Sequence, residues 1–180
     1  MNIFAAVLNR KKLMSEICIY VKLPTYIKQW FVNLHGGEPV HLARGSAESE
    51  IVKRFITKLP ENTMPQVREE GDTAICIPTY KNGPDPRYYN YMPRAPMRLL
   101  VSTINTTFRI QLHRELSCFF CKPNVELQDL IYSWMEQNGI EATETNWCAV
   151  SKVYQRMRES YKRNKRRLNQ KASAKNKKLS

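Results

Sequence analysis

The chain has 180 residues, of which 42% are hydrophobic. It is long enough for one ordinary domain or two small ones with a packed core, and this composition excludes a chain that is disordered throughout. The formal charge is +13, and it is concentrated at one end. Residues 151–180 hold twelve Lys or Arg and one acid, Glu159, a net of +11, whereas the first 150 residues carry only +2. This asymmetry predicts an acidic partner, nucleic acid first and an anionic membrane surface second.

The cysteine count and the opening residues bear on the compartment. An odd number of cysteines without a secretory signal is typical of a reducing compartment, so we expect a cytoplasmic protein. The apolar run Ile3 to Leu8 is short, and charges follow it, the reverse of a signal peptide. No apolar stretch approaches the roughly 20 residues that cross a bilayer. Met14 is a candidate natural start, which makes residues 1–13 a peripheral extension; the alternative is an N-terminal helix that docks on the body.

In chain order, the first predicted elements form a small β-α-β-α-β unit over residues 14–80. Apolar residues alternate from Ile17 to Leu23, which predicts a strand. A helix follows from Thr25 to Gly36-Gly37, glycines that tolerate the positive φ of a helix end. The unit is completed by a short strand over 38–43, a helix from Gly45-Ser46 to the residue before Pro60, an acidic loop to Asp72 and a buried strand over 73–78.

The remainder is predicted to be mainly helical. Residues 81–96 hold four prolines, which forbid a helix and indicate a linker or an ordered loop. Over residues 97–168 the pattern predicts a helix after Pro96, a second helix over 125–138 that Gly139 ends, and a final helix from about Asn146 to 165. Residues 169–180 have too little apolar surface for its burial to offset the conformational entropy lost on ordering, so we expect a disordered basic tail. The fold class is therefore α+β, with a helical C-terminal part.

The final helix carries the functional hypothesis. Trp147, Val150, Tyr154, Met157 and Tyr161 recur at spacings of three and four, which predicts an apolar stripe that anchors the helix to the body. The charges continue beyond this stripe, so we expect the helix to project. With the preceding helix it has the outline of a helix-turn-helix, although the six-residue connection is longer than that motif usually has.

A single acid cannot neutralise so many bases through pairs within the helix, and a polyanion relieves their repulsion by releasing counterions. We therefore expect nucleic-acid contact through basic residues of this helix. These are Lys152, Arg156, Arg158, Lys162, Arg163, Lys165, Arg166 and Arg167. Arg156, Arg163 and Arg166 are the candidates for reading base edges.

The loop at 81–96 is a second candidate for nucleic-acid contact. Its tyrosines could stack on unpaired bases while neighbouring arginines hold phosphates. The residues concerned are Arg87, Tyr88, Tyr89, Tyr91, Arg94 and Arg98. The alternative, which we favour, is a proline-rich connector whose tyrosines pack on the body.

Metal binding and catalysis find little support. Cys118-x-x-Cys121 is a single cysteine pair, whereas structural zinc commonly needs two such pairs. His113 upstream and Cys148 could complete a site after folding, but buried structural thiols are expected.

Catalytic motifs are also missing from the sequence. No phosphate-binding loop, dinucleotide fingerprint or H-E-x-x-H motif is present. His35 is expected to cap a helix end, and Glu48 and Glu50 to complement a helix dipole. We expect no cofactor, no metal and no enzymatic activity.

The sequence thus predicts a cytoplasmic, non-enzymatic nucleic-acid-binding protein, with DNA favoured over RNA, in a regulatory (transcription) or architectural role. The N-terminal α+β unit would bind a protein partner or self-associate, and no membrane contact is expected. One alternative is an assembly module whose basic tail binds an acidic protein; another is an accessory subunit of a nucleic-acid-processing complex. The size and the basic tail are similar to those of many small proteins of phages and mobile elements.

Overall fold

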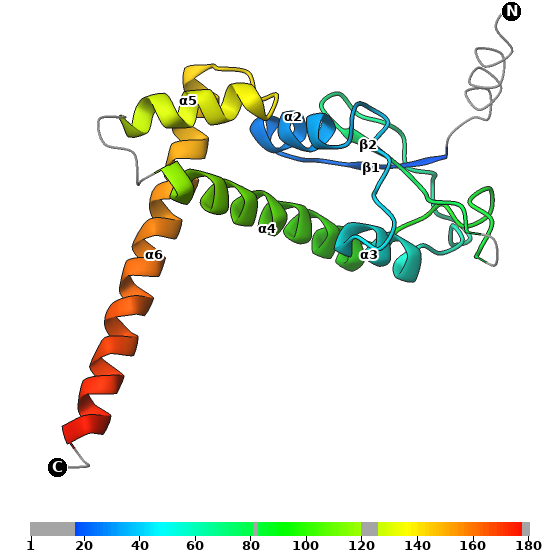
Figure 1. Cartoon of the computed structure of the whole chain (residues 1–180). Coiled ribbons are helices and arrows are strands. Elements are labelled where there is room, and N and C mark those ends of the chain that lie inside the picture. The colour runs from blue at the N-terminus through cyan, green and yellow to red at the C-terminus, as the bar shows by residue number, and fades with distance from the viewer. Residues whose placement is uncertain (1–16, 81–82, 120–125, 178–180) are drawn as a thin grey trace, which may run out of the picture. The chain divides into compact units, whose positions relative to one another are not determined.

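The computed structural model describes residues 17–80, 83–119 and 126–177, so the predicted extension at 1–13 and the choice of start lie outside it. The described chain is mixed α+β and mostly helical (Figure 1). Its elements are β1 (Cys18–Val21), α2 (Thr25–Leu34), α3 (Ala47–Phe55), β2 (Thr73–Cys76), α4 (Arg94–Phe119), α5 (Leu127–Gln137) and α6 (Glu144–Lys177). Over the residues described, no helix is both long and apolar enough to cross a membrane.

The chain divides into two compact units. Unit 1 comprises the chain through Leu23 together with Phe31–Ile104, and unit 2 comprises Pro24–Trp30 together with the chain from Asn105 onward. Helices α2 and α4 therefore each contribute residues to both units. On α4, every fourth residue from Leu100 to Leu116 is buried, as the predicted apolar face of this helix requires.

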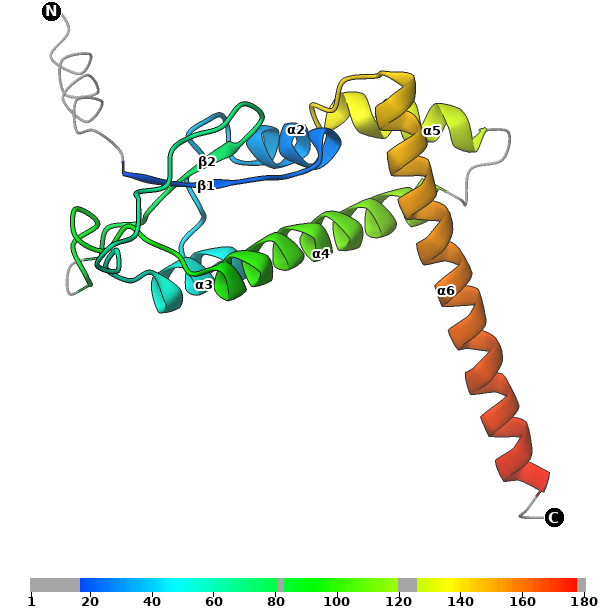
Figure 2. The same ribbon diagram turned by 180° about the vertical axis from the view of Figure 1, so that it is seen from behind.

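Unit 1 contains a two-stranded sheet in place of the predicted β-α-β-α-β arrangement, which is not confirmed. Strands β1 and β2 lie side by side and antiparallel (Figures 1 and 2). The strand expected over 38–43 is reduced to a single parallel bridge between Val40 and Ile75. A side chain stops the ladder before Val40. The Glu38 carboxylate accepts the Ala74 N–H at 2.8 Å, which takes the place of a backbone acceptor.

Helix α3 begins where the sequence predicts but ends at Phe55, before the predicted end at Leu59, because Ile56 is extended and Thr57 pairs with Tyr91. Ser46 is its N-cap, and the Ser46 hydroxyl accepts a hydrogen bond from the Ser49 N–H at 3.1 Å. Glu48 and Glu50 lie in the first turn, where their charge complements the helix dipole. Val52 is fully buried and fixes the inward face of the helix.

The end of α2 is confirmed at the two glycines, but the role of His35 is not. Gly36 has a φ of 80°, and the Gly37 N–H donates to the Val32 carbonyl at 3.0 Å, which closes the last turn. His35 does not cap the carbonyls of its own helix. Its Nδ1 lies 3.1 Å from the His41 carbonyl oxygen, and its ring meets the edge of Phe31 at 4.7 Å. The side chain ties the helix end to the following loop.

Helix α4 begins earlier than the loop boundary at residue 96 predicts. It starts at Arg94, so Pro96 lies inside its first turn. Proline is tolerated there because the first N–H groups of a helix have no partner within the helix. The prolines at 84, 86 and 93 remain outside the helix, as expected.

Unit 2 is built around a cluster of four aromatic rings. Phe108 lies at its centre and makes edge-to-face contacts with Tyr26 (5.5 Å), Trp30 (5.2 Å) and Trp134 (5.7 Å) between ring centroids. The two indole N–H groups are satisfied: Trp134 donates to Glu115 at 2.7 Å and Trp30 to Gln111 at 3.2 Å. The cluster joins α2, α4 and α5. Edge-to-face pairs add about 0.5–1.5 kcal/mol each to the burial of the rings.

We predict that Phe108→Ala lowers the free energy of unfolding of unit 2 by about 3–5 kcal/mol, because it leaves a cavity among three rings. Urea denaturation followed by tryptophan fluorescence measures this. Ile110→Ala, on the same helix but with a side chain exposed to solvent, is the matched control and should change stability by less than about 0.5 kcal/mol. Equal losses in the two variants would contradict the central role of Phe108.

We also predict a pH dependence that arises from His35. Burial lowers the pKa of His35 below its ordinary value, against the opposing effects of the His41 carbonyl and Glu48. At pH values between the folded-state pKa of His35 and about 6.5, the unfolded chain therefore binds a proton more readily than the folded chain does. The free energy of unfolding thus falls as the pH falls through this window. His35→Gln should reduce the loss of unfolding free energy between pH 7.5 and 5.5. An unchanged pH slope in that variant, with His113→Gln as the control, would refute the assignment.

Candidate nucleic-acid interface

The start of α6 is fixed by a buried polar group. Asn146 is only 4% exposed, and its side-chain amide donates to the Gln29 side-chain oxygen at 3.1 Å and to the Glu141 carbonyl at 3.0 Å. The same Gln29 oxygen accepts the Glu141 N–H at 3.1 Å. Thr143 precedes the helix, and its hydroxyl accepts the Asn146 N–H at 3.3 Å. These bonds join α2, the α5–α6 turn and the first turn of α6.

The apolar stripe of α6 anchors a shorter part of the helix than the sequence suggests. Val150 and Tyr154 are buried and Met157 is half-buried, but Tyr161 is 60% exposed and keeps only a tilted ring contact with His113, at 6.1 Å. The anchored part therefore ends near Met157. The physical reason is length. The 11 residues of α5 extend for roughly 16 Å, whereas the 34 residues of α6 extend for roughly 51 Å. In both ribbon views, α6 runs on past α5 (Figures 1 and 2).

Helix α6 also continues further than predicted. It reaches Lys177, where the sequence predicts that the helical part ends at 168 and a disordered tail follows. Residues 144–180 contain no glycine or proline and many good helix formers. Glu144 lies in the first turn and the bases lie toward the C-terminus, so both ends complement the helix dipole. We call residues 158–177 the basic half of α6.

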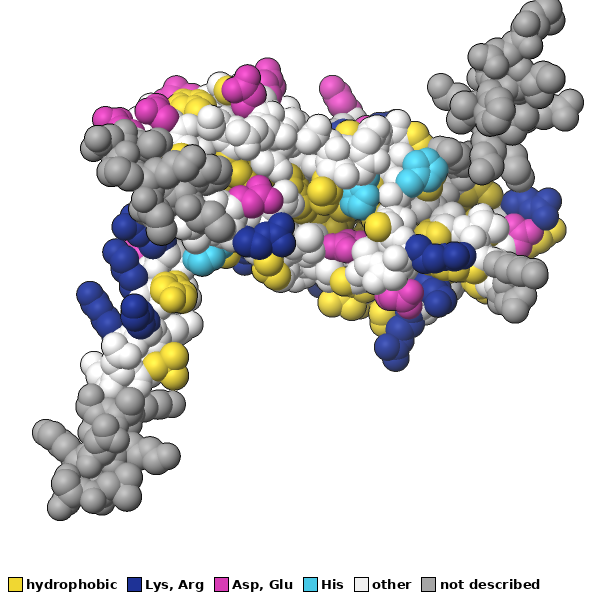
Figure 3. All heavy atoms as spheres, viewed as in Figure 1, with side chains coloured by type: hydrophobic (Ala, Val, Ile, Leu, Met, Phe, Trp, Pro, Cys, Tyr) yellow, Lys and Arg dark blue, Asp and Glu magenta, His cyan; other side chains and the backbone are white. Residues whose placement is uncertain are grey.

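The predicted contact residues share one broad face of this helix. All of them are exposed on α6: Lys152, Arg156, Arg158, Lys162, Arg163, Lys165, Arg166 and Arg167. At 3.6 residues per turn they cover an arc of about 200°. Through residue 170, the opposite strip is uncharged and includes Ser160, Asn164 and the 67% exposed Leu168. Figure 3 shows Lys and Arg side chains along one side of α6 and hydrophobic ones along the other.

The elements that precede the basic half carry the opposite charge. From residue 123 to residue 151 there is no Lys or Arg, but there are five acids: Glu126, Asp129, Glu136, Glu141 and Glu144. Figure 3 shows acidic side chains over α5. A helix-turn-helix places the first helix across the phosphate backbone and the start of the second against the bases. The acids on α5 and the buried Asn146 argue against that mode of docking, and the predicted helix-turn-helix is not confirmed.

The tyrosine and arginine loop makes contacts within unit 1. Arg87 donates to both oxygens of Asp85, with Nη2–Oδ2 at 2.7 Å, and these hydrogen bonds lower the pKa of the Asp85 carboxyl. The Tyr89 ring lies 5.4 Å below the Lys58 ammonium, and the Tyr91 backbone pairs with Thr57. The last three candidates, Tyr88, Arg94 and Arg98, are exposed. The contacts made by Arg87, Tyr89 and Tyr91 support a connector rather than a stacking surface.

The thiols that the structure brings together are not the predicted ones. The side chains of Cys118 and Cys121 lie outside the described part of the structure. Within the described part, no group of three or more His, Cys, Asp or Glu side chains could hold a metal. Instead, Cys18 and Cys76 face each other across β1 and β2, with sulfur atoms 3.6 Å apart. Both predicted strands held a cysteine, but only the register of the strand pair places the two thiols opposite each other.

Comparisons with protein-family models, with curated proteins and with solved structures found no match to this chain.

We predict that Asn146→Ala lowers the free energy of unfolding of unit 2 by about 1–3 kcal/mol, because it removes two hydrogen bonds, to the Gln29 side-chain oxygen and to the Glu141 carbonyl, that contribute about 0.5–1.5 kcal/mol each. Thr145→Ala, at the exposed neighbouring position, is the control. Urea denaturation of both variants gives the comparison. A loss no larger for Asn146→Ala than for the control would show that this polar group does not fix the helix.

Proposed function

We propose that this chain binds nucleic acid, duplex DNA before RNA, through the basic half of α6, in a regulatory or architectural role and without catalysis. One observation carries the proposal. From Arg158 to residue 170 every side chain is exposed, six of these residues are bases, and Glu159 is the single acid. A helix segment that is exposed along its length and carries this charge is suited to a polyanion.

The physical basis is the repulsion that the helix contains in the absence of a ligand. Arg158, Lys162 and Arg166 follow one another at spacings of four, where like charges destabilise a helix. Phosphates of a duplex remove this repulsion and release their condensed counterions when the bases bind. Residues 158–170 extend for roughly 20 Å, a length over which a duplex carries roughly twelve phosphates. The helix therefore has enough phosphates within reach for all of its bases.

The charge distribution also supports an orientation. The acids of α5 repel phosphates, so unit 2 would meet the duplex with the basic half of α6 and not with the helix pair. Contacts of this kind go mainly to the backbone and carry little sequence information. Arg156, Arg163 and Arg166 remain the residues we propose for any contact with base edges. A partner for unit 1, or its self-association, also remains a proposal.

A second candidate function is binding to an acidic protein. The observation that favours it is the uncharged strip of α6, where Tyr161 and Leu168 are 60% and 67% exposed beside the bases. An acidic helix with an apolar seam would contact both sets of side chains. Phosphates would contact the bases and leave the strip unused, so the two functions depend on different faces of the same helix.

We predict that Arg163→Gln, Arg166→Gln and Arg167→Gln together weaken binding to random duplex and flatten its dependence on salt. The slope of log Kobs against log salt should fall by about 0.9 for each phosphate that the variant no longer neutralises, hence by up to about 2.7. Fluorescence anisotropy across a salt series measures it. The matched control is Ser160→Ala, Asn164→Ala and Leu168→Ala on the uncharged strip, which should keep the slope of the native chain.

A truncation gives an independent test. The chain should be ended after Met157, because Ser151 and Tyr154 are buried and their removal would damage the core of unit 2. The truncated chain should lose most of its affinity for duplex. If the truncation and the arginine variant bind duplex like the native chain, the proposal is wrong. If Tyr161→Ala with Leu168→Ala abolishes binding to an acidic amphipathic peptide that carries leucines at helical spacing, and duplex binding is weak throughout, the second candidate is favoured.

A further inference from the structure

Strands β1 and β2 place two thiols opposite each other. Cys18 pairs with Cys76, and the neighbouring pair is hydrogen-bonded, with the Ile77 N–H donating to the Ile17 carbonyl at 2.9 Å. Pairs alternate along an antiparallel ladder, so Cys18 and Cys76 form a non-hydrogen-bonded pair, the kind in which opposing Cα atoms lie closest, at about 4.5 Å. This spacing lies within the range that a disulfide spans. The two sulfur atoms are already 3.6 Å apart.

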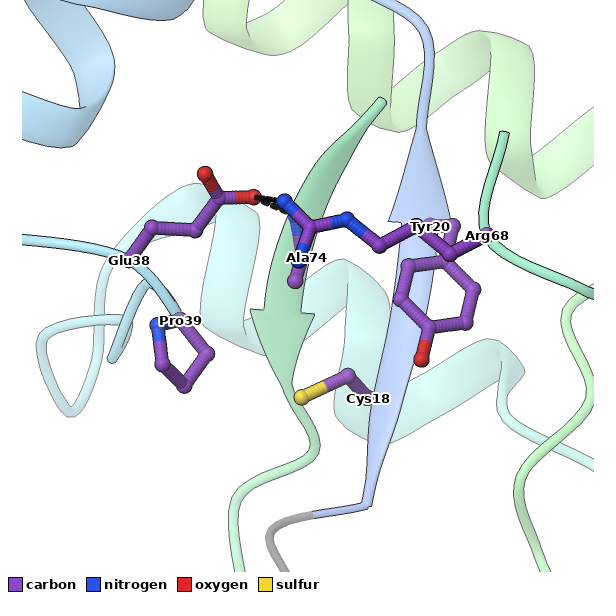
Figure 4. Close-up of a pocket in the computed structure, with 6 residues that line it drawn as sticks. All are labelled: Cys18, Tyr20, Glu38, Pro39, Arg68 and Ala74. Carbon is purple, nitrogen blue, oxygen red and sulfur yellow. Dashed lines mark hydrogen bonds and ion pairs between the residues drawn. The ribbon is translucent and has the colours of Figure 1, made fainter. Parts of the chain in front are cut away.

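The two thiols differ in access. Cys18 is half-buried and lines an open pocket of about 240 Å³, whose other walls are Tyr20, Glu38, Pro39, Arg68 and Ala74. Figure 4 shows the Cys18 sulfur pointing from β1 toward β2. Cys76 is buried and lies behind it on the neighbouring strand. A small reagent in the pocket therefore meets Cys18 first.

Polar groups beside the pair suit thiol chemistry. The Nε2 atom of His41 lies 3.9 Å from the Cys76 sulfur, close enough to take its proton. The Arg68 guanidinium lies in the pocket wall, where Glu38 holds it at 2.7 Å (Figure 4). Because Glu38 neutralises Arg68, His41 is the group that acts on a thiol, and the thiolate is the form of cysteine that reacts. The site thus contains an accessible thiol, a second thiol within reach and a base.

We propose that Cys18 and Cys76 are a reversible dithiol–disulfide pair, oxidised by a low-molecular-weight disulfide such as glutathione disulfide. The Cys18 thiolate attacks one sulfur of the small disulfide, forms a mixed disulfide and releases one small thiolate. Cys76 then gives its proton to His41 and attacks the Cys18 sulfur, which releases the second small thiolate. The protein dithiol loses two electrons and two protons, and the small disulfide is reduced to two thiols.

The disulfide would lock the sheet of unit 1. It would join β1 to β2 across a separation of 58 residues, and closing a loop of that length restricts the unfolded chain. Oxidised protein should therefore melt at a higher temperature than reduced protein. The inference rests on unit 1 alone and does not depend on the function proposed for α6.

The test uses the full chain with Cys118→Ser, Cys121→Ser and Cys148→Ser, so that only Cys18 and Cys76 remain. Native protein is incubated with glutathione disulfide, and its remaining thiols are alkylated and counted by intact-mass spectrometry. We expect a species that has lost two hydrogen atoms, takes up no alkylating reagent, melts at a higher temperature and reverts with dithiothreitol. Peptide mapping of the unsubstituted chain should show the same Cys18–Cys76 link, which guards against an effect of the serine background on folding.

Single substitutions in that background test the order of the steps. With Cys76→Ser, the reaction should stop at one glutathione adduct on Cys18. With Cys18→Ser, the buried Cys76 should form adducts many times more slowly. The proposal is overturned if both thiols stay open to alkylation in the native protein, if two adducts accumulate without a link, or if the link forms only in urea.

Discussion

The buried amide of Asn146 is the contact on which the arrangement of unit 2 depends. It donates to Gln29 and to the Glu141 carbonyl, and so joins α2, the α5–α6 turn and α6 at one point. A buried amide without partners would be costly, so these bonds specify where α6 begins as well as stabilise it. Val150 and Tyr154, further along the helix, then fix its direction through burial. Residues 158–170 of the basic half of α6 are exposed, and their position follows from this anchored start.

From α5 to the end of α6, charge is separated in the same order as burial. The acids lie on α5, the turn and the first turn of α6, and the bases follow from Lys152 onward. The negative part of this segment therefore coincides with its packed part, and the positive part with the exposed helix. This order stabilises a long helix through its dipole and limits where a polyanion can approach. One sequence feature thus supports both the helix and its proposed use.

Much of the fold could be predicted because local rules decide it. Glycines at 36 and 37 end α2, Ser46 caps α3, and the alternation after Ile17 forms β1. The errors arose where contacts between segments far apart in the sequence decided the outcome. The strand expected at 38–43 is reduced to one bridge because the Glu38 side chain, and not its backbone, pairs with Ala74 of β2, and α3 ends early where Thr57 pairs with Tyr91.

The candidate site was predicted only in part, because it also depends on contacts between elements. The spacing that buries Tyr154 also continues to Tyr161, but burial requires a neighbour, and α5 is too short to provide one. The Cys18–Cys76 pair depends on strand register, which composition and spacing within a single segment cannot specify.

The most direct test of the proposed interface is hydrogen–deuterium exchange of the native chain with and without random duplex DNA at low salt. We expect duplex to slow exchange in residues 158–177, where the helix has few tertiary contacts, and to leave α5 unchanged. Protection of α5 or of unit 1, with none in the basic half of α6, would contradict the proposed interface.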